Sequence, residues 1–183
     1  MNQEVEIKVF VKNPEQVEAK LKKEGKFIKE KTQKDEYLTP QHEDFFDIHP
    51  PVEYIRVRYE DEDTNIEYQF LTFDKDGTLL TTDEYETKIE NPDMMVKILK
   101  KLDFKHKVTV TKNRKYFDYK DFEVLIDHIK ELGYFIEVEA KNAKGDVKEI
   151  KKQCYKVLEE LGADWHETPN MGYPIMILEK EGK

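Results

Sequence analysis

Charged residues repeat in one fixed pattern at three places in the sequence. The segments EVEIK (4–8), EYETK (84–88) and EVEAK (137–141) all read Glu-x-Glu-x-Lys. Because successive side chains of an extended strand point to opposite faces, the two carboxylates and the lysine of each segment share one face. A single copy is typical of the wet face of a sheet. Three copies favour a shared chemical role for these faces.

Basic residues follow the same alternation. Arg56 and Arg58 stand two apart in YIRVRY, and Lys112 and Arg114 stand two apart in VTKNRK. Carboxylates that converge repel one another and hold protons unless a cation neutralises them, and clustered oxygen ligands suit Mg²⁺ or Mn²⁺. Lysine supplies positive charge for phosphate, and arginine adds a bidentate fork. These residue types predict a metal and polyphosphate site; the alternative is a network of salt bridges on a solvated sheet face.

Each repeat leads into a predicted amphipathic helix. The helix start signals are Asn13, Asn91 and Asp146, and the sequence places glycine stops at Gly25 and Gly162. Apolar residues recur on one face of each helix, and this face must be buried against another element. The single cysteine, Cys154, falls on such a face, where core packing is favoured over a role as a nucleophile.

Further alternating segments predict strands that are joined by short turns. They are 52–61, 67–73, 106–119 and 122–129, with a hairpin signal at Asp76-Gly77 and an irregular segment at 39–51. Short hairpins favour a mainly antiparallel sheet. If the helices cover the outside of a curved sheet, its charged faces turn inward. We therefore predict an α+β fold with a closed antiparallel barrel, a charged interior and helices outside.

Composition narrows the class of protein. The chain has 183 residues, enough for one domain over 1–183, and 31 basic against 40 acidic residues give a net charge of −9. This charge argues against a nucleic-acid partner. One cysteine cannot form an internal disulfide, the N-terminus does not read as a signal peptide, and no apolar run approaches the ~18 residues of a membrane span. A cytoplasmic protein without a membrane partner is expected.

The ordered set of charged motifs resembles the CYTH family, the triphosphate tunnel metalloenzymes, and within it the class IV adenylyl cyclase (CyaB-like) branch. The resemblance starts at the Glu-x-Glu-x-Lys strand and runs through nearly the whole chain; its residues are Glu4, Glu6, Lys8, Arg56, Arg58, Glu86, Val110, Lys112, Arg114, Asp127, Gly133, Glu137 and Glu139. It implies an eight-stranded antiparallel tunnel that holds a triphosphate with a divalent metal ion.

The resemblance also implies roles for individual residues. Metal binding, of Mg²⁺ or Mn²⁺, is expected at Glu4, Glu6, Glu86, Glu137 and Glu139. Catalytic charge is expected from Lys8, Arg56, Arg58, Lys112 and Arg114. These five basic residues also bind the substrate, together with Lys88, Asp127 and Tyr173.

The resemblance leaves the reaction open among three possibilities. The first is cyclisation of ATP to cyclic AMP and pyrophosphate. The second is hydrolysis of thiamine triphosphate or inorganic triphosphate, and the third is a polyphosphate- or nucleotide-binding module without catalysis. One departure from the family pattern bears on this choice: Asp74 stands where a lysine is common, with Lys75 one residue later. A homodimer is a further possibility.

Overall fold

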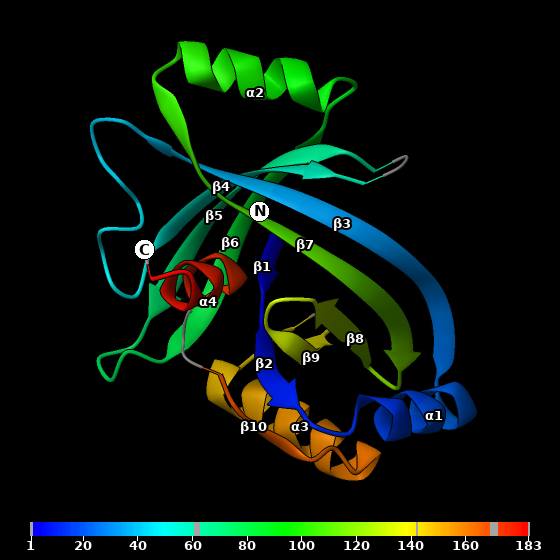
Figure 1. Ribbon diagram of the computed structural model, residues 1–183. Coiled ribbons are helices and arrows are strands. Elements are labelled where there is room, and N and C mark those ends of the chain that lie inside the picture. Colours follow the sequence, from blue (N-terminus) through cyan, green and yellow to red (C-terminus); the bar gives the residue numbers. More distant parts are fainter. Residues whose placement is uncertain (1, 61–62, 142, 169–171, 183) are drawn as a thin grey trace. The chain divides into compact units, whose positions relative to one another are not determined.

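The computed structural model describes residues 2–60, 63–141, 143–168 and 172–182, without the side chains of residues 2–4. Figure 1 labels the elements. The strands are β1 (Asn2–Glu4), β2 (Glu6–Val11), β3 (Lys26–Pro40), β4 (Glu53–Tyr59), β5 (Asn65–Phe73), β6 (Leu79–Lys88), β7 (Phe104–Tyr119), β8 (Phe122–Ile129), β9 (Gly133–Ala140) and β10 (Trp165–Glu167). The helices are α1 (Pro14–Glu24), α2 (Pro92–Lys101), α3 (Val147–Leu161) and α4 (Tyr173–Lys180).

The chain divides into two compact units that are interleaved in sequence. Unit 1 comprises residues 1–3, 32–111 and 170–183, and unit 2 comprises residues 4–31 and 112–169. Strands β3 and β7 each run from one unit into the other without a break. The prediction of a single domain over 1–183 stays a prediction, and each unit is described below by itself.

Unit 2 is an antiparallel sheet with two helices on its apolar face. Strands β7, β8, β9, β2 and β10 are neighbours in that order. Val9 lies opposite Ile136, which lies opposite Ile126, so three strands present apolar side chains to the same side. These residues form one core with Leu21 of α1 and Leu158 of α3. The apolar faces of the first and third Glu-x-Glu-x-Lys strands, β2 and β9, are therefore buried under helices as predicted, whereas Tyr85 in the second copy, on β6, is 51% exposed.

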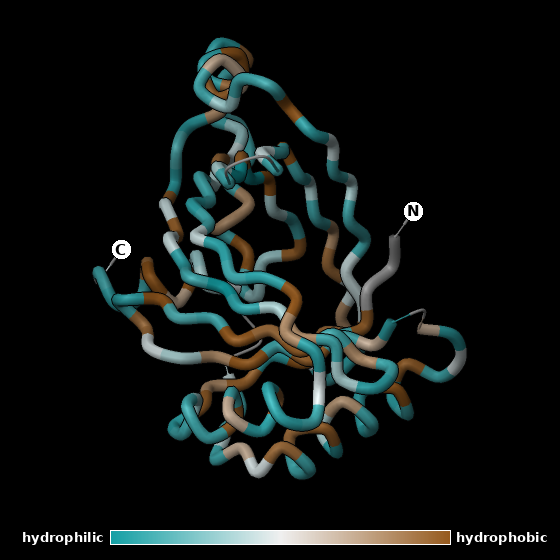
Figure 2. Tube along the Cα trace, turned by 90° about the vertical axis from the view of Figure 1, so that its right-hand side faces the viewer, coloured by the Kyte–Doolittle hydropathy of each residue, from teal (hydrophilic) through white to brown (hydrophobic). Residues whose placement is uncertain are grey.

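Unit 1 also packs a helix against the apolar face of an antiparallel sheet. Strands β3, β4, β5 and β6 pair antiparallel in sequence order. Leu38 and Val57 pack with Val96 and Leu99 of α2. Figure 2 shows the alternation of hydrophilic and hydrophobic residues along the strands that makes such one-sided cores possible.

The helix ends follow the start and stop signals with one exception. The side chains of Asn91 and Asp146 accept hydrogen bonds from the amides of Met94 and Lys148, and Gly162 ends α3 with φ 69°. Asn13 also precedes a helix but does not cap it. Its side chain instead donates to the carbonyl of Gly162 at 2.9 Å and accepts from the amide of Asp164 at 2.7 Å.

The α+β class and the antiparallel pairing are confirmed. The described residues form ten strands where eight were expected, and closure of the sheet stays a prediction. The sequence reading missed β3, whose first half is polar at most positions, and the short elements β10 and α4. It placed β8 at its observed bounds and the β5–β6 hairpin around Gly77, which has a φ of 76°.

Candidate functional site

The polar face of unit 2 carries a cluster that we call the Lys8 cluster: Glu6, Lys8, Lys112, Arg114, Asp127 and Glu137. Strand pairing puts its members side by side, because Lys8 lies opposite Glu137 and Arg114 lies opposite Asp127. These side chains alternate with the core residues of β2, β8 and β9, so they point away from the helices.

Ion pairs join five members of the Lys8 cluster: Lys8, Lys112, Arg114, Asp127 and Glu137. Arg114 Nε donates to Asp127 Oδ1 at 2.6 Å, and its Nη2 pairs with both Asp127 and Glu137. Lys8 Nζ lies 3.0 Å from Glu137 Oε1. Lys112 Nζ lies 3.6 Å from Asp127 Oδ2. Because Asp127 and Lys112 are only 0% and 2% exposed, these charges belong to a packed interior face.

The two glutamates of this cluster have opposite pKa shifts. Burial raises the pKa of Glu6, and the charge of Glu137 raises it further. Burial would also raise the pKa of Glu137, but Arg114, Lys8 and Lys112 outweigh it and hold that pKa well below its usual range. Its cationic neighbours therefore favour the ionised form of Glu137, whereas the ionised form of Glu6 lacks full compensation.

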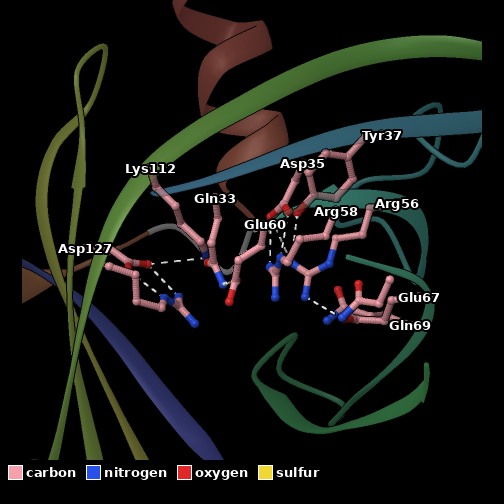
Figure 3. Close-up of polar contacts among 12 residues, drawn as sticks. Gln33, Asp35, Tyr37, Arg56, Arg58, Glu60, Glu67, Gln69, Lys112 and Asp127 are labelled. Carbon is pink, nitrogen blue, oxygen red and sulfur yellow. Dashed lines mark hydrogen bonds and ion pairs between the residues drawn. The ribbon is translucent and has the colours of Figure 1, made fainter. Parts of the chain in front are cut away.

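The polar face of unit 1 carries a second cluster, the Arg58 cluster: Gln33, Asp35, Arg56, Arg58, Glu60 and Glu67. Strand pairing places Asp35 opposite Arg58, and Arg56 opposite Glu67. Arg58 Nε and Nη2 donate to the two oxygens of Asp35 at 2.7 and 2.9 Å (Figure 3). Arg56 donates to Glu67 at 2.7 Å and to Asp35 at 3.3 Å. Gln33 donates to Glu60.

Burial makes these contacts strong. Asp35 and Glu67 are each 1% exposed, and the side chain of Arg56 is 11% exposed. Burial would lower the pKa of Arg56, but the charges of Glu67 and Asp35 outweigh it and raise the pKa well above its usual value. Arg56, Arg58 and Arg114 are the only arginines in the sequence, and all three lie in the two clusters.

Some buried polar atoms of the Arg58 cluster are left without a partner. Among the described residues, Arg56 Nε, Glu67 Oε1 and the neighbouring Asn65 Oδ1 are buried and make no hydrogen bond. Such atoms are rare in folded proteins and indicate a place for a water molecule, an ion or a ligand group. A donor or cation would satisfy Glu67, and an acceptor would satisfy Arg56.

Other predicted site residues lie apart from these buried contacts. Glu86 is opposite Glu67 but is exposed, and it accepts a hydrogen bond from Asn65 at 3.2 Å. Lys88 is exposed and pairs with Asp63 at 2.8 Å. Tyr173 is buried at the start of α4. Their roles stay predictions.

The remaining predicted metal ligands are on the first and ninth strands. Glu139 is half-buried and lies opposite Glu6. The side chain of Glu4 is outside the described residues, so its role stays a prediction as well. The departure at Asp74 has a structural use, because its carboxylate accepts hydrogen bonds from the amides of Asp76 and Thr78 in the β5–β6 turn. Lys75 is exposed in the same turn.

Sequence reasoning missed four members of the Arg58 cluster: Gln33, Asp35, Glu60 and Glu67. Glu67 had a detectable signal, since Asn65, Glu67 and Gln69 alternate with Ile66, Tyr68 and Phe70. Asp35 had none, because its neighbours in TQKDEY are also polar. Only the pairing of β3 with β4 reveals its position opposite Arg58.

The divalent cation that the family resemblance implies agrees with these donors in kind. Carboxylate oxygens are ligands that Mg²⁺ and Mn²⁺ prefer, and both Glu6 and the unpartnered Glu67 oxygen would gain from a nearby cation. Among the described side chains, no three histidines, cysteines, aspartates or glutamates are already grouped as a ligand set. Phosphate and water oxygens would have to complete the shell.

Comparison with known proteins shows which family the chain belongs to. The CYTH domain family model matches residues 2–166. A Methanocaldococcus jannaschii protein named "Putative adenylate cyclase MJ0240" is 37% identical over 161 residues, which cover 87% of this chain and 88% of that protein. In the described part of the chain, no helix has the length and apolar character to cross a membrane.

Solved structures show the same fold. The PH1819 protein of Pyrococcus horikoshii has a TM-score of 0.81 at 26% identity, covering 97% of this chain and 99% of that one. A Hippeastrum protein, "Putative adenylyl cyclase HpAC1", described with a dominant triphosphatase activity, has a TM-score of 0.67 at 15% identity and covers 98% of this chain and 96% of its own. The family match and the curated relative together show that this chain belongs to the CYTH domain family.

Proposed function

We propose that this protein is a metal-dependent enzyme that acts on a triphosphate, converting ATP to cyclic AMP and pyrophosphate. The observation that carries the proposal is the gathering of all three arginines, with Lys8 and Lys112, on the polar faces of the two units. Arginine forks match phosphate oxygens, and burial strengthens their charge interactions. The curated relative that is named as an adenylate cyclase supports the choice of reaction.

In this reaction the ribose 3′-oxygen attacks the α-phosphorus and gives up its proton. The bond from the α-phosphorus to the bridging oxygen breaks, and pyrophosphate leaves. We assign Lys8, Lys112 and Arg114 of unit 2, and Arg56 and Arg58 of unit 1, to neutralising and orienting the phosphates, with Lys88, Asp127 and Tyr173 as further substrate contacts. Positioned charge of this kind stabilises the transition state of phosphoryl transfer.

A divalent cation, Mg²⁺ or Mn²⁺, would be held by Glu4, Glu6, Glu86, Glu137 and Glu139, and it would supply additional neutralisation of the triphosphate charge. Closure of the strands into the tunnel that the family resemblance predicts is part of this proposal, with more strands than the eight that were expected.

Hydrolysis of the terminal phosphate is the second candidate. It is supported by the fold shared with the Hippeastrum protein, whose described activity is that of a triphosphatase. The same basic residues would neutralise the triphosphate while water attacks the terminal phosphorus and orthophosphate leaves. The substrate would then be thiamine triphosphate or inorganic triphosphate.

One assay separates the alternatives. The purified protein is incubated with ATP, thiamine triphosphate or tripolyphosphate in Mg²⁺ or Mn²⁺, and the products are identified by chromatography. Cyclic AMP with pyrophosphate supports the cyclase, and orthophosphate supports the triphosphatase. Tight binding without product indicates a binding module, and neither binding nor product would contradict the proposal.

A matched pair of variants ties the activity to the site. Lys112→Ala removes a lysine that is 2% exposed and pairs with Asp127, and we expect it to abolish most of the turnover. Lys152→Ala removes an exposed lysine of α3 that pairs with Glu149, and turnover should be unchanged. Equal activity of the two variants would argue against the assignment.

A further inference from the structure

Two of the three arginines of the chain are held by aspartates in the same geometry. Arg58 directs Nε and Nη2 at the two oxygens of Asp35, and Arg114 directs Nε and Nη2 at the two oxygens of Asp127. In both cases the aspartate lies directly opposite the arginine on the neighbouring strand. The same fork thus occurs once in each unit.

Asp35 also contacts a second arginine besides Arg58, the residue directly opposite it. Its Oδ2 also accepts from Arg56 Nη1 at 3.3 Å, so one carboxylate contacts both arginines of β4. The pairing with Arg58 uses Nε and Nη2, which leaves the Nη1 edge of that guanidinium out of the fork. Arg56 is fixed from a second side by Glu67.

Burial of the charged Asp35 carboxylate costs free energy unless hydrogen bonds and opposite charges compensate it. A carboxylate that is 1% exposed loses its hydration, and only well-formed hydrogen bonds and opposite charges offset this loss. The contacts with Asp35 order two arginine side chains, Arg56 and Arg58, that would otherwise be flexible. An arginine that is already oriented loses less conformational entropy when it meets a phosphate.

We propose that Asp35 is a positioning residue that holds the guanidinium groups of Arg58 and Arg56 in the orientation in which they meet the phosphate oxygens of the substrate. This inference rests on the proposed triphosphate chemistry and adds a residue to it. Asp35 acts through the arginines and does not itself contact the substrate.

Asp35→Asn tests this role, because it keeps the shape of the side chain and removes its charge and one acceptor. On the best triphosphate substrate, kcat should fall about 10²-fold, since misplaced catalytic groups lose this much, while KM changes less than about threefold. Asp35→Glu, which restores the charge, should recover part of kcat. A role in stability alone would lower Tm and leave the kcat of the folded protein unchanged.

Asp44→Asn is the matched control within unit 1. Asp44 also pairs with two cationic side chains, Lys105 and Lys107, but lies outside the Arg58 cluster. Its kcat and KM should equal those of the wild type. Wild-type kcat in Asp35→Asn would overturn the inference and leave the proposed function intact.

A substrate-free measurement completes the test. Because the chain contains three arginines, the side-chain ¹⁵Nε–Hε NMR spectrum should hold three signals, assignable with Arg→Lys variants. Asp35→Asn should speed hydrogen exchange at the Arg58 Nε–Hε at least about tenfold and leave Arg114 unaffected. An unchanged Arg58 signal would overturn the inference. If the wild type neither binds nor converts any triphosphate, the proposed function fails, and an altered Arg58 signal then reports only an ion pair.

Discussion

The choice between arginine and lysine differs sharply between the polar faces and the rest of the chain. Of the 31 basic residues, only Arg56, Arg58 and Arg114 are arginines, and each forms a buried fork or pair with a carboxylate. Arginine keeps its charge when buried and presents donors in a fixed plane, whereas lysine is a more strongly hydrated point charge. Geometry therefore matters more than net charge at these three positions.

Removal of one arginine should affect both activity and stability. Arg56→Ala is expected to reduce kcat/KM about 10²-fold, the usual loss for one preorganised charge-stabilising donor. Because it also leaves the buried Asp35 and Glu67 with less compensation, we expect it to cost about 3 kcal/mol of stability. Arg56→Lys should recover only part of the activity, since an ammonium cannot reproduce the fork. Steady-state kinetics beside a thermal melt measures both effects, and wild-type kcat/KM in Arg56→Ala would contradict the assignment.

The opposite pKa shifts of Glu6 and Glu137 predict opposite effects of the same substitution. The raised pKa of Glu6 means that the folded protein favours its protonated form, so ionised Glu6 destabilises the fold above that pKa. Glu6→Gln should raise Tm at pH 7 to 8 and lose this advantage below about pH 4. The depressed pKa of Glu137 means that its stabilisation is present above its unfolded pKa and is lost as the pH falls through the folded value. Glu137→Gln should therefore lower Tm at pH 7 to 8.

The role of Glu6 in metal binding can be tested with the same variant. In Glu6→Gln, Mg²⁺ or Mn²⁺ should no longer strengthen the binding of tripolyphosphate, as measured by calorimetry with and without chelator. The thermal melts are recorded without metal, so that the two effects stay separate. A lower Tm for Glu6→Gln at neutral pH, or unchanged metal stimulation, would count against the role of this carboxylate.

Secondary structure was predictable wherever one face of an element is apolar. Strands β2, β8 and β9 and helices α1, α2 and α3 all bury such a face, and their periodicity indicates both the element and its orientation. Strand β3 begins KFIKEKTQKDE, in which polar residues occupy both faces, so no period-two signal exists over its first half. Its extended state is stabilised by its neighbours in the sheet, which no local pattern records.

The candidate site was predictable only in part for the same reason. Lys8, Lys112, Arg114, Asp127 and Glu137 come together because strand alternation puts them on the face opposite the core and strand register then sets them side by side. The partners of Arg56 and Arg58 depend on long-range pairing of β3 and β5 with β4. Glu86 and Lys88 continue the charged pattern past the buried part of β6, so the motif does not reveal that they are exposed.

Helix α3 should keep its single thiol unreactive. Cys154 is fully buried among core residues, and burial raises the pKa of its thiol to about 11. At pH 8 a thiol-specific disulfide reagent should react with the folded protein far more slowly than with the protein in denaturant. Cys154→Ala should retain wild-type turnover, as expected for a core residue. Fast labelling of the folded protein, or lost turnover at unchanged fold, would indicate a chemical role.

At the scale of the whole molecule, the two units carry related charged clusters on interleaved segments. The sequence enters unit 2, passes through unit 1 from residue 32 to residue 111, and returns to unit 2. The strands that make these passages, β3 and β7, are continuous and contribute to both units. Neither unit is a separate stretch of chain, which distinguishes this architecture from two domains joined by a linker.

This connectivity predicts that the two units unfold together, because loss of one unit removes half of β3 and half of β7 from regular pairing. The single tryptophan, Trp165, lies in unit 2 and reports on that unit by its fluorescence. Val57→Ala creates a cavity in the core of unit 1, where Val57 is 0% exposed, and should cost about 2 kcal/mol. The urea midpoint from Trp165 fluorescence should then shift as far as the midpoint from far-UV circular dichroism. A fluorescence midpoint that stays at its wild-type value would show that unit 2 unfolds independently.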